Sequence, residues 1–243
     1  MIFDQKGEWM TRSLYREHRK ARRSPTAAGI ASALFRNDLC FLYADYFFQR
    51  FDATKRLMIV AKGLTIDDVA PEFNLQDADG HSFSLSDLVG KPVALLFMRY
   101  VGCPVCQMDT IEYKQQYQAL KDAGLEVVMV FQSSLDNLQR YSVKEVLPFT
   151  TLSDPKGEVY KAYGAGWGIG GFLSVKNLSP MVRSLKSGHR HGKFEGNEFQ
   201  YPAAFIIDMD GRVRFSHYGK TVTDGISPQA LLNEFKALDL LAA

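Results

Sequence analysis

The sequence has little cysteine and no long uninterrupted apolar run. Three cysteines among 243 residues cannot form the framework of a disulfide-stapled fold. The most apolar stretch, residues 27–48, contains Arg36, Asp38 and Asp45, so no membrane-spanning helix is predicted. Ordinary counts of 19 glycines and 9 prolines exclude collagen-like and low-complexity chains. With 46% hydrophobic residues and 17 phenylalanines, the chain is predicted to bury a globular core.

The net charge of +2 conceals an uneven distribution. Residues 1–57 carry eleven Lys or Arg against six Asp or Glu, whereas residues 58–243 have more acidic than basic side chains. The second part therefore lacks the basic excess that nucleic acid requires, and no nucleic-acid partner is expected. We predict that residues 1–57 are a separate basic, helical N-terminal extension.

Three interpretations of this extension stay open. The basic run from Arg12 to Arg23 fits a solvated helix face, an organelle transit peptide or an arm that binds anionic partners. Asp4 and Glu8 argue against a transit peptide, and no secretory signal is predicted at the start of the chain. A domain start at Met58 would make the extension dispensable. We expect a cytoplasmic protein, with organelle targeting by the extension as the alternative.

Beyond residue 70, strand and helix signals alternate. Unbroken apolar runs at 93–98 and 125–131 predict strands buried on both faces. The other predicted elements are a hairpin over 73–85, helices after Cys106, at 135–146 and at 229–238, a short strand at 149–152, and a hairpin of 203–207 with 212–215. This order predicts an α/β, thioredoxin-like fold with a central mixed sheet flanked by helices.

A Cys-x-x-Cys motif, Cys103 to Cys106, lies between the first buried strand and the following helix. Free backbone N–H groups and the helix dipole stabilise a thiolate at a helix N-terminus. Pro104 suits the first helical turn, and Arg99 is the nearest candidate cation. One helical turn brings the two sulfurs within bridging distance, so we predict a reversible redox pair.

Two alternatives to a redox pair stay open. A zinc site needs four ligands, and nothing in the spacing gathers Cys40, His189 and His191 around the motif. Two buried structural cysteines are the second alternative. We expect neither a metal nor a cofactor.

These segments resemble the peroxiredoxin-like branch of the AhpC/TSA family, which includes the selenoprotein U-like proteins. The resemblance covers about residues 64–240, which we predict to be one domain. It is carried by the stretches APEF, DADG, SLSDL, FMR with CPVC, LSDPKGE, and HGKFEGNE followed by PAAFIID. It implies that Cys103 is the attacking cysteine and Cys106 the resolving one. It matches Arg99 to the arginine ahead of the motif, and Pro202 to a proline that is cis and lies against the disulfide.

The sequence departs from the family pattern at three positions. Tyr100 stands where true peroxiredoxins carry threonine, Pro202 where they carry a second arginine, and Gly102 where this branch usually has tryptophan. The first two departures remove groups that position a peroxide. We predict an antioxidant thiol peroxidase that is reduced by a thioredoxin-, glutaredoxin- or glutathione-type partner. The sequence is also compatible with a homodimer. The alternatives are a thiol-disulfide oxidoreductase acting on protein disulfides and a non-enzymatic redox-sensing module.

Three further groups of residues invite a functional interpretation. Residues 164–171 lack the Lys-Ser/Thr of a phosphate loop, so a mobile surface loop is predicted, with Trp167 as a cover of the active-site rim. His189 and His191 are predicted to be solvated. Glu195 and Glu198 precede Pro202 and are predicted to be ordinary surface carboxylates, the alternative being that one of them approaches the cysteines and relays a proton.

Overall fold

The computed structural model describes residues 2–3, 9–10 and 63–240. The chain divides into two units, residues 1–59 and 60–243. In the first unit, β1 (Ile2–Phe3) pairs antiparallel with β2 (Trp9–Met10). The helix predicted in the extension lies outside the described residues, as does Met58. Among the described residues, no helix is long and apolar enough to cross a membrane.

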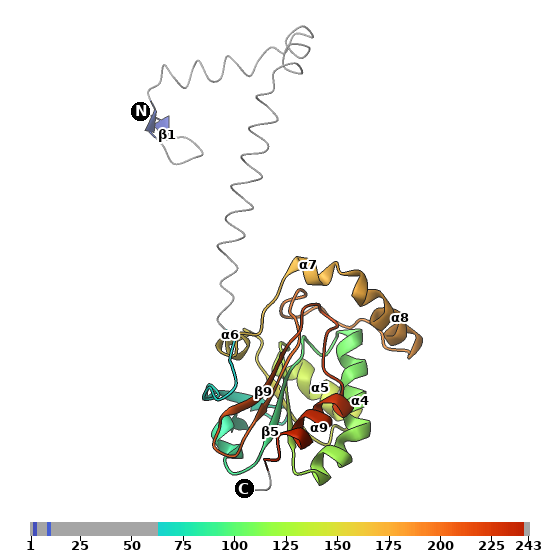
Figure 1. Cartoon of the computed structure of the whole chain (residues 1–243). Helices are drawn as coiled ribbons and strands as arrows, with labels where there is room; N and C mark the ends of the chain where they lie inside the picture. The colour runs from blue at the N-terminus through green and yellow to red at the C-terminus, as the bar shows by residue number, and fades with distance from the viewer. Residues whose placement is uncertain (1, 4–8, 11–62, 241–243) are drawn as a thin grey trace. The chain divides into compact units, whose positions relative to one another are not determined.

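The second unit is built on a seven-stranded mixed sheet with strand order β4-β3-β7-β6-β5-β8-β9 (Figure 1). The strands are β3 (Asn74–Asp77), β4 (Ser82–Ser84), β5 (Val93–Phe97), β6 (Glu126–Phe131), β7 (Thr150–Ser153), β8 (Ala203–Ile207) and β9 (Val213–Tyr218). Strands β5, β6 and β7 are parallel, whereas β8 runs antiparallel to β5 and β3 to β7. Both predicted hairpins and both buried strands are confirmed.

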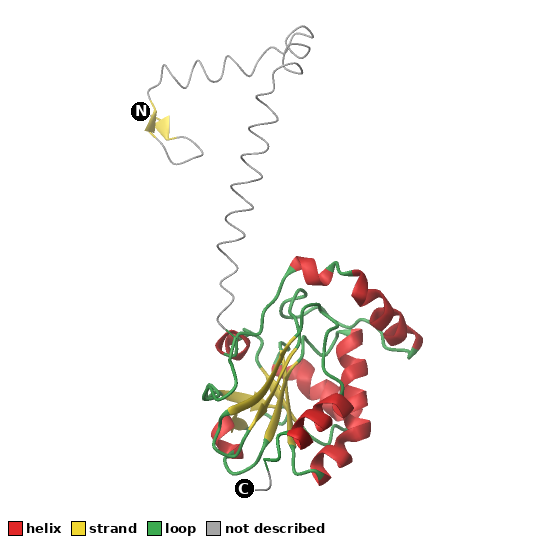
Figure 2. Cartoon of the chain, in the orientation of Figure 1, coloured by secondary structure: helices red, strands yellow, loops and turns green. Residues whose placement is uncertain are grey.

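Helices cover both faces of this sheet (Figure 2). They are α4 (Pro104–Asp122), α5 (Leu135–Glu145), α6 (Glu158–Ala162), α7 (Ile169–Phe172), α8 (Leu178–Lys186) and α9 (Pro228–Ala237), with short 3₁₀ turns η1 (Leu85–Leu88) and η2 (Val175–Asn177). Successive β5 side chains point to opposite faces: Leu96 joins the core under α4, α5 and α9, and Leu95 the core under α6. The predicted thioredoxin-like fold is confirmed.

An aromatic cluster fixes the end of β5 that leads into the cysteine motif. The ring of Phe97 lies 4.9 Å from that of Tyr160, 5.1 Å from that of Tyr163 and 5.8 Å from that of Phe205. The contacts with Tyr160 and Phe205 are edge-to-face and the one with Tyr163 is tilted, and such contacts add to the free energy gained from burying the rings. The Tyr160 hydroxyl also donates a hydrogen bond to the Val130 carbonyl at 2.7 Å. These contacts hold the C-terminal end of β5, and so the start of the cysteine motif, in a fixed position.

Residues 164–171 are only partly the loop that the sequence predicts, because α7 begins at Ile169. Backbone hydrogen bonds join Gly168 to Phe199 and Tyr201 to Gly166, both at 3.0 Å. A side chain at Gly171 would lie 2.5 Å from the Tyr201 ring, so this close approach requires glycine. These long-range contacts, which no local pattern predicts, fold the segment onto residues 199–201.

Candidate active site

Cys103 is the N-cap residue of α4. Its Sγ accepts a hydrogen bond from the Cys106 backbone N–H at 3.3 Å, and Pro104 occupies the first helical position. Both thiols are free, with exposed fractions of 0% and 5%. The predicted placement of the motif at a helix N-terminus is confirmed.

Arg99 binds the sulfur of Cys103 directly. Its Nη2 lies 2.8 Å from the Cys103 Sγ, and its Nη1 donates to the Glu198 carbonyl at 2.8 Å. The arginine is only 7% exposed, so the guanidinium acts on the sulfur with little screening by water. The sequence-based expectation that Arg99 is the cation near the motif is confirmed.

The electrostatics of the pair favour a thiolate on Cys103. Burial raises the pKa of this thiol, but the hydrogen bond from Cys106 and the charge of Arg99 outweigh burial and lower the pKa to about 7. The hydrogen bond to Cys103 together with burial raises the pKa of Cys106 well above its usual value. At neutral pH the structure therefore combines a reactive thiolate with a protonated partner thiol.

We expect alkylation of Cys103 by iodoacetamide to titrate with a midpoint near pH 7. The folded-state pKa lies below the ordinary thiol pKa of about 8.5. The thiolate and its stabilising contacts are therefore fully present above about pH 8.5 and are lost as the pH falls through about 7. Labelling rates between about pH 5 and pH 9, read by peptide mass spectrometry, measure this midpoint. A midpoint at the ordinary thiol value would contradict the stabilisation by Arg99.

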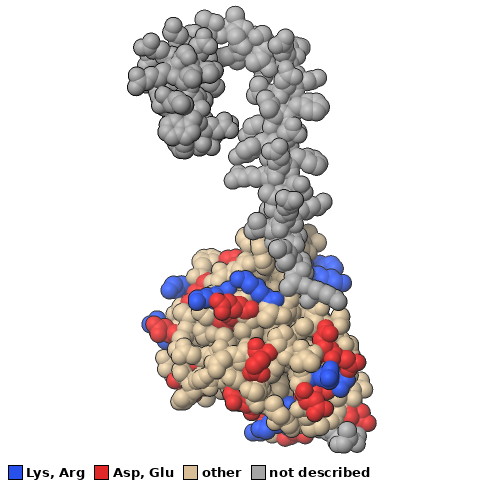
Figure 3. Space-filling view, turned by 90° about the vertical axis from the view of Figure 1, so that its left-hand side faces the viewer, with Lys and Arg blue, Asp and Glu red and all other residues tan. Residues whose placement is uncertain are grey.

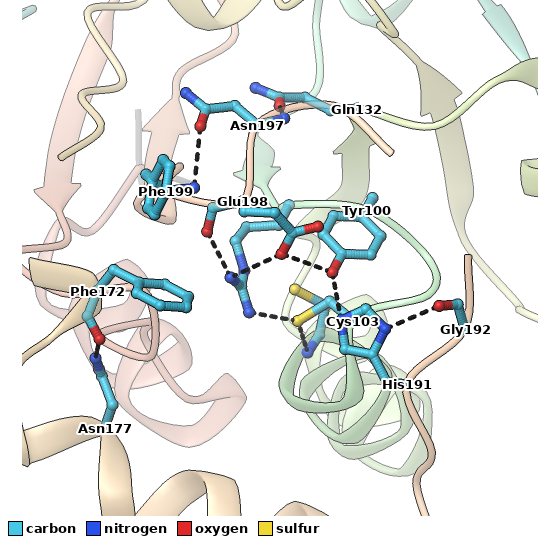
Figure 4. Close-up of polar contacts among 12 residues, drawn as sticks. Tyr100, Cys103, Gln132, Phe172, Asn177, His191, Gly192, Asn197, Glu198 and Phe199 are labelled. Carbon is cyan, nitrogen blue, oxygen red and sulfur yellow. Dashed lines mark hydrogen bonds and ion pairs between the residues drawn. The ribbon is translucent and has the colours of Figure 1, made fainter. Parts of the chain in front are cut away.

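A second layer of polar side chains converges beside Cys103 (Figure 4). The Tyr100 hydroxyl donates to Glu198 Oε2 at 2.8 Å and lies 2.8 Å from His191 Nε2. Burial and the hydrogen bond to Glu198 raise the pKa of Tyr100, which keeps it a neutral phenol. His191 is exposed as predicted, but its bond to Tyr100 makes it part of the site.

Residues 191–198, which we call the cover segment, lie across the start of α4. The Gly192 N–H donates to the Gly102 carbonyl at 2.8 Å. A Cβ at Gly102 would lie 2.5 Å from the Lys193 carbonyl oxygen, which explains why this chain has no tryptophan there. The cover segment thus depends on a glycine immediately before the attacking cysteine.

The two glutamates of the cover segment have different surroundings. Glu198 contacts Tyr100, and its Oε2 lies 3.9 Å from Arg99 Nη1, so it is not the ordinary surface carboxylate that the sequence favoured but lies near the cysteines. Glu195 instead accepts hydrogen bonds from Ser134 Oγ at 2.9 Å and Asn137 Nδ2 at 2.5 Å. Burial raises the pKa of Glu195, but these bonds outweigh it and the net shift is downward. Glu195 therefore anchors the cover segment to the start of α5.

Pro202 differs from its expected conformation. No peptide bond among the described residues is cis, so the cis geometry expected of Pro202 is wrong. The trans form is the preferred one for a bond before proline, and here the chain continues directly into β8. The Pro202 carbonyl accepts a hydrogen bond from the Gly219 N–H at 2.9 Å. A role for Pro202 at the disulfide stays a prediction.

Sequence reasoning missed Asp109, which follows Cys106 by three residues on α4. Burial raises the pKa of its carboxyl to about 8. The carboxyl lines a cavity of about 150 Å³ together with Arg183 of α8. The spacing of one helical turn from Cys106 was the available signal.

Metal-binding side chains do not gather at the cysteines in the part of the chain that the structure describes. There, such side chains meet at Asp77, Asp79 and His81, in the turn between β3 and β4. Asp77 Oδ1 accepts hydrogen bonds from the backbone of Asp79 and His81, as in an ordinary turn. Cys40 lies outside the described residues.

A buried thiolate paired with a second thiol at a helix N-terminus, on this fold, defines a thiol-dependent oxidoreductase. The model of the AhpC/TSA family matches residues 66–216, and the chain belongs to this family.

Known relatives agree with the family match. Peroxiredoxin Bcp of Escherichia coli (strain K12) is 29% identical over 150 residues, which are 62% of this chain and 83% of that protein. Chloroplastic peroxiredoxin Q of Oryza sativa subsp. japonica is 33% identical over 111 residues, covering 46% and 51% of the two chains. The crystal structure of peroxidoxin BcpB from Mycobacterium tuberculosis has a TM-score of 0.54 at 18% identity, covering 72% of this chain and 97% of that one, and supports the fold. The chain is an enzyme of the peroxiredoxin-like branch; a selenoprotein U-like position within it stays a prediction.

Proposed function

We propose that the protein reduces peroxides through Cys103. The observation that carries the proposal is the 2.8 Å contact between Arg99 and the Cys103 sulfur, which together with Cys106 favours the thiolate. The thiolate attacks the terminal oxygen of the peroxide, the O–O bond breaks, and the leaving oxygen takes up a proton to give water or an alcohol. Cys103 is left as a sulfenic acid.

Cys106 completes the reaction in this proposal. Its thiol condenses with the sulfenic acid, water leaves, and a Cys103–Cys106 disulfide forms. Two thiols of a thioredoxin-, glutaredoxin- or glutathione-type reductant then reduce the disulfide and become oxidised themselves. Because Cys103 is completely buried, the cover segment must move before such a reductant reaches the sulfurs. A homodimer and a cytoplasmic location stay predictions.

Disulfide exchange with other proteins is the second candidate function. It is favoured by Tyr100, whose hydroxyl is engaged by Glu198 and His191 and is not free to hold a peroxide. Burial of Cys103 favours the first candidate, because a small peroxide needs less displacement of the cover segment than a protein disulfide does.

A sulfenic-acid trap separates the two functions. We expect Cys106→Ser, treated with hydrogen peroxide and dimedone, to label at Cys103 on the order of a hundredfold faster than free cysteine does. The variant Cys103→Ser is the control and should give no such labelling. If labelling is no faster than that of free cysteine and the protein catalyses the reduction of insulin disulfides, disulfide exchange becomes the function of the protein in place of peroxide reduction.

A further inference from the structure

Helix α8 turns its apolar face away from the domain. Leu178, Met181, Val182 and Leu185 recur at the spacing of one helix face, and their exposed fractions range from 41% to 67%. The side that packs on α4 contributes Ser184, which is fully buried. The amphipathic pattern is therefore the inverse of that in a helix that covers a core.

The exposed apolar set extends into the segments that precede and follow α8 in the sequence. It includes six more large side chains that are at least 37% exposed: Trp167, Ile169, Phe172, Leu173, Val175 and Phe194. Figure 1 shows α7 and α8 following one another along the outer edge of the domain. We call residues 167–194 the α7–α8 surface. Exposed apolar area of this extent marks an interaction site.

The charge of the α7–α8 surface has one sign. Residues 167–194 include no Asp or Glu and five exposed basic residues: Lys176, Arg183, Lys186, Arg190 and Lys193. An acidic neighbour, Glu112 of α4, lies 3.9 Å from Arg183. On the face seen in Figure 3, by contrast, acidic and basic side chains are intermixed. Apolar side chains bordered by cations are the composition of segments that lie in the headgroup layer of anionic membranes.

We propose that the α7–α8 surface docks on an anionic lipid membrane. A second copy fits less well, because a symmetric contact would bring the same cations together. The chain's own residues 1–57 also fit poorly, since they have an excess of basic side chains. Lipid headgroups supply the negative charge and the acyl boundary covers the apolar side chains, with no groove required.

The docked surface adjoins the cysteine site. The ring of Phe194 lies 4.0 Å from that of His191, and His191 contacts the Tyr100 hydroxyl. The cover segment over Cys103 would therefore face the lipid. If the proposed peroxidase function holds, on which this step rests, hydroperoxides of membrane lipids are the substrate class that this position favours.

Vesicle flotation of the full chain tests the docking. We expect binding to phosphatidylcholine vesicles that contain phosphatidylglycerol, at least about tenfold weaker binding to phosphatidylcholine alone, and weakening at about 0.5 M salt. The triple variant Leu178→Gln, Met181→Gln, Leu185→Gln should lose at least about tenfold in binding to the anionic vesicles. The control Val89→Gln, Val143→Gln changes apolar residues elsewhere that are even more exposed, at 73% and 71%, and should bind normally.

Three outcomes would overturn the docking proposal. The first is that the wild-type chain does not bind anionic vesicles, and the second is that the triple variant binds them as well as wild type does. The third is that the wild-type chain sediments as a dimer and binds no lipid, whereas the triple variant sediments as a monomer. The reaction of Cys103 with hydrogen peroxide is measured on the same samples. The triple variant should react normally, so a failure of membrane docking and a failure of the peroxidase proposal give different results.

Discussion

Replacing Arg99 by methionine is expected to slow the reaction of Cys103 with peroxide by about 10²- to 10³-fold at pH 7. Part of the loss comes from the thiolate population. Burial raises the pKa of Cys103, and Arg99 is one of the groups that oppose this effect. Without the guanidinium the pKa of Cys103 rises, and the thiolate becomes a minor form at neutral pH. The rest comes from the missing donor, which lies 2.8 Å from the sulfur and stabilises charge at the reacting atoms.

The pH profile distinguishes this explanation from simple unfolding. For Arg99→Met the alkylation midpoint should move upward from about 7, while circular dichroism confirms a folded chain. Arg140→Met, on the exposed side of α5, is the matched control and should behave as wild type. Arg99→Lys keeps the charge but loses the forked geometry, so an intermediate rate is expected. An unchanged midpoint in Arg99→Met would mean that Arg99 does not lower the pKa of Cys103.

Replacing Gly102 by alanine is expected to displace the cover segment. The added Cβ would lie 2.5 Å from the Lys193 carbonyl oxygen and 3.1 Å from its amide nitrogen, and a backbone cannot yield as a flexible side chain does. Overpacking of this kind costs about 1–3 kcal/mol of unfolding free energy. Because the same shift uncovers a cysteine that is 0% exposed, alkylation of Cys103 should become about tenfold faster or more at a fixed pH.

Urea unfolding and iodoacetamide labelling measure the two effects on the same variant. Gly170→Ala is the matched control, because an added Cβ there meets no atom within 4 Å. Its stability and labelling rate should match those of wild type. Wild-type labelling in Gly102→Ala would mean that the contact between Gly102 and Gly192 does not limit access to Cys103.

The sequence alone determines the parts of this protein that depend on local pattern. An apolar run of strand length is a signal contained in a few neighbouring residues. Strands β5 and β6 lie where the runs at 93–98 and 125–131 predict them. The placement of Cys103 at a helix start follows from Pro104 and the helical spacing after it. Arg99 reaches the sulfur across only four residues, so this contact was also predictable.

Only the tertiary structure decides how the cysteines are enclosed. Glu198 and His191 reach Tyr100 across more than ninety positions in the chain, and no periodicity or spacing encodes such a contact. The same holds for the backbone approach that requires Gly102, since it depends on how the cover segment packs on the start of α4. Helix α8 escaped prediction for a related reason: its apolar residues face outward, so the helix is not specified by burial in the domain's own core.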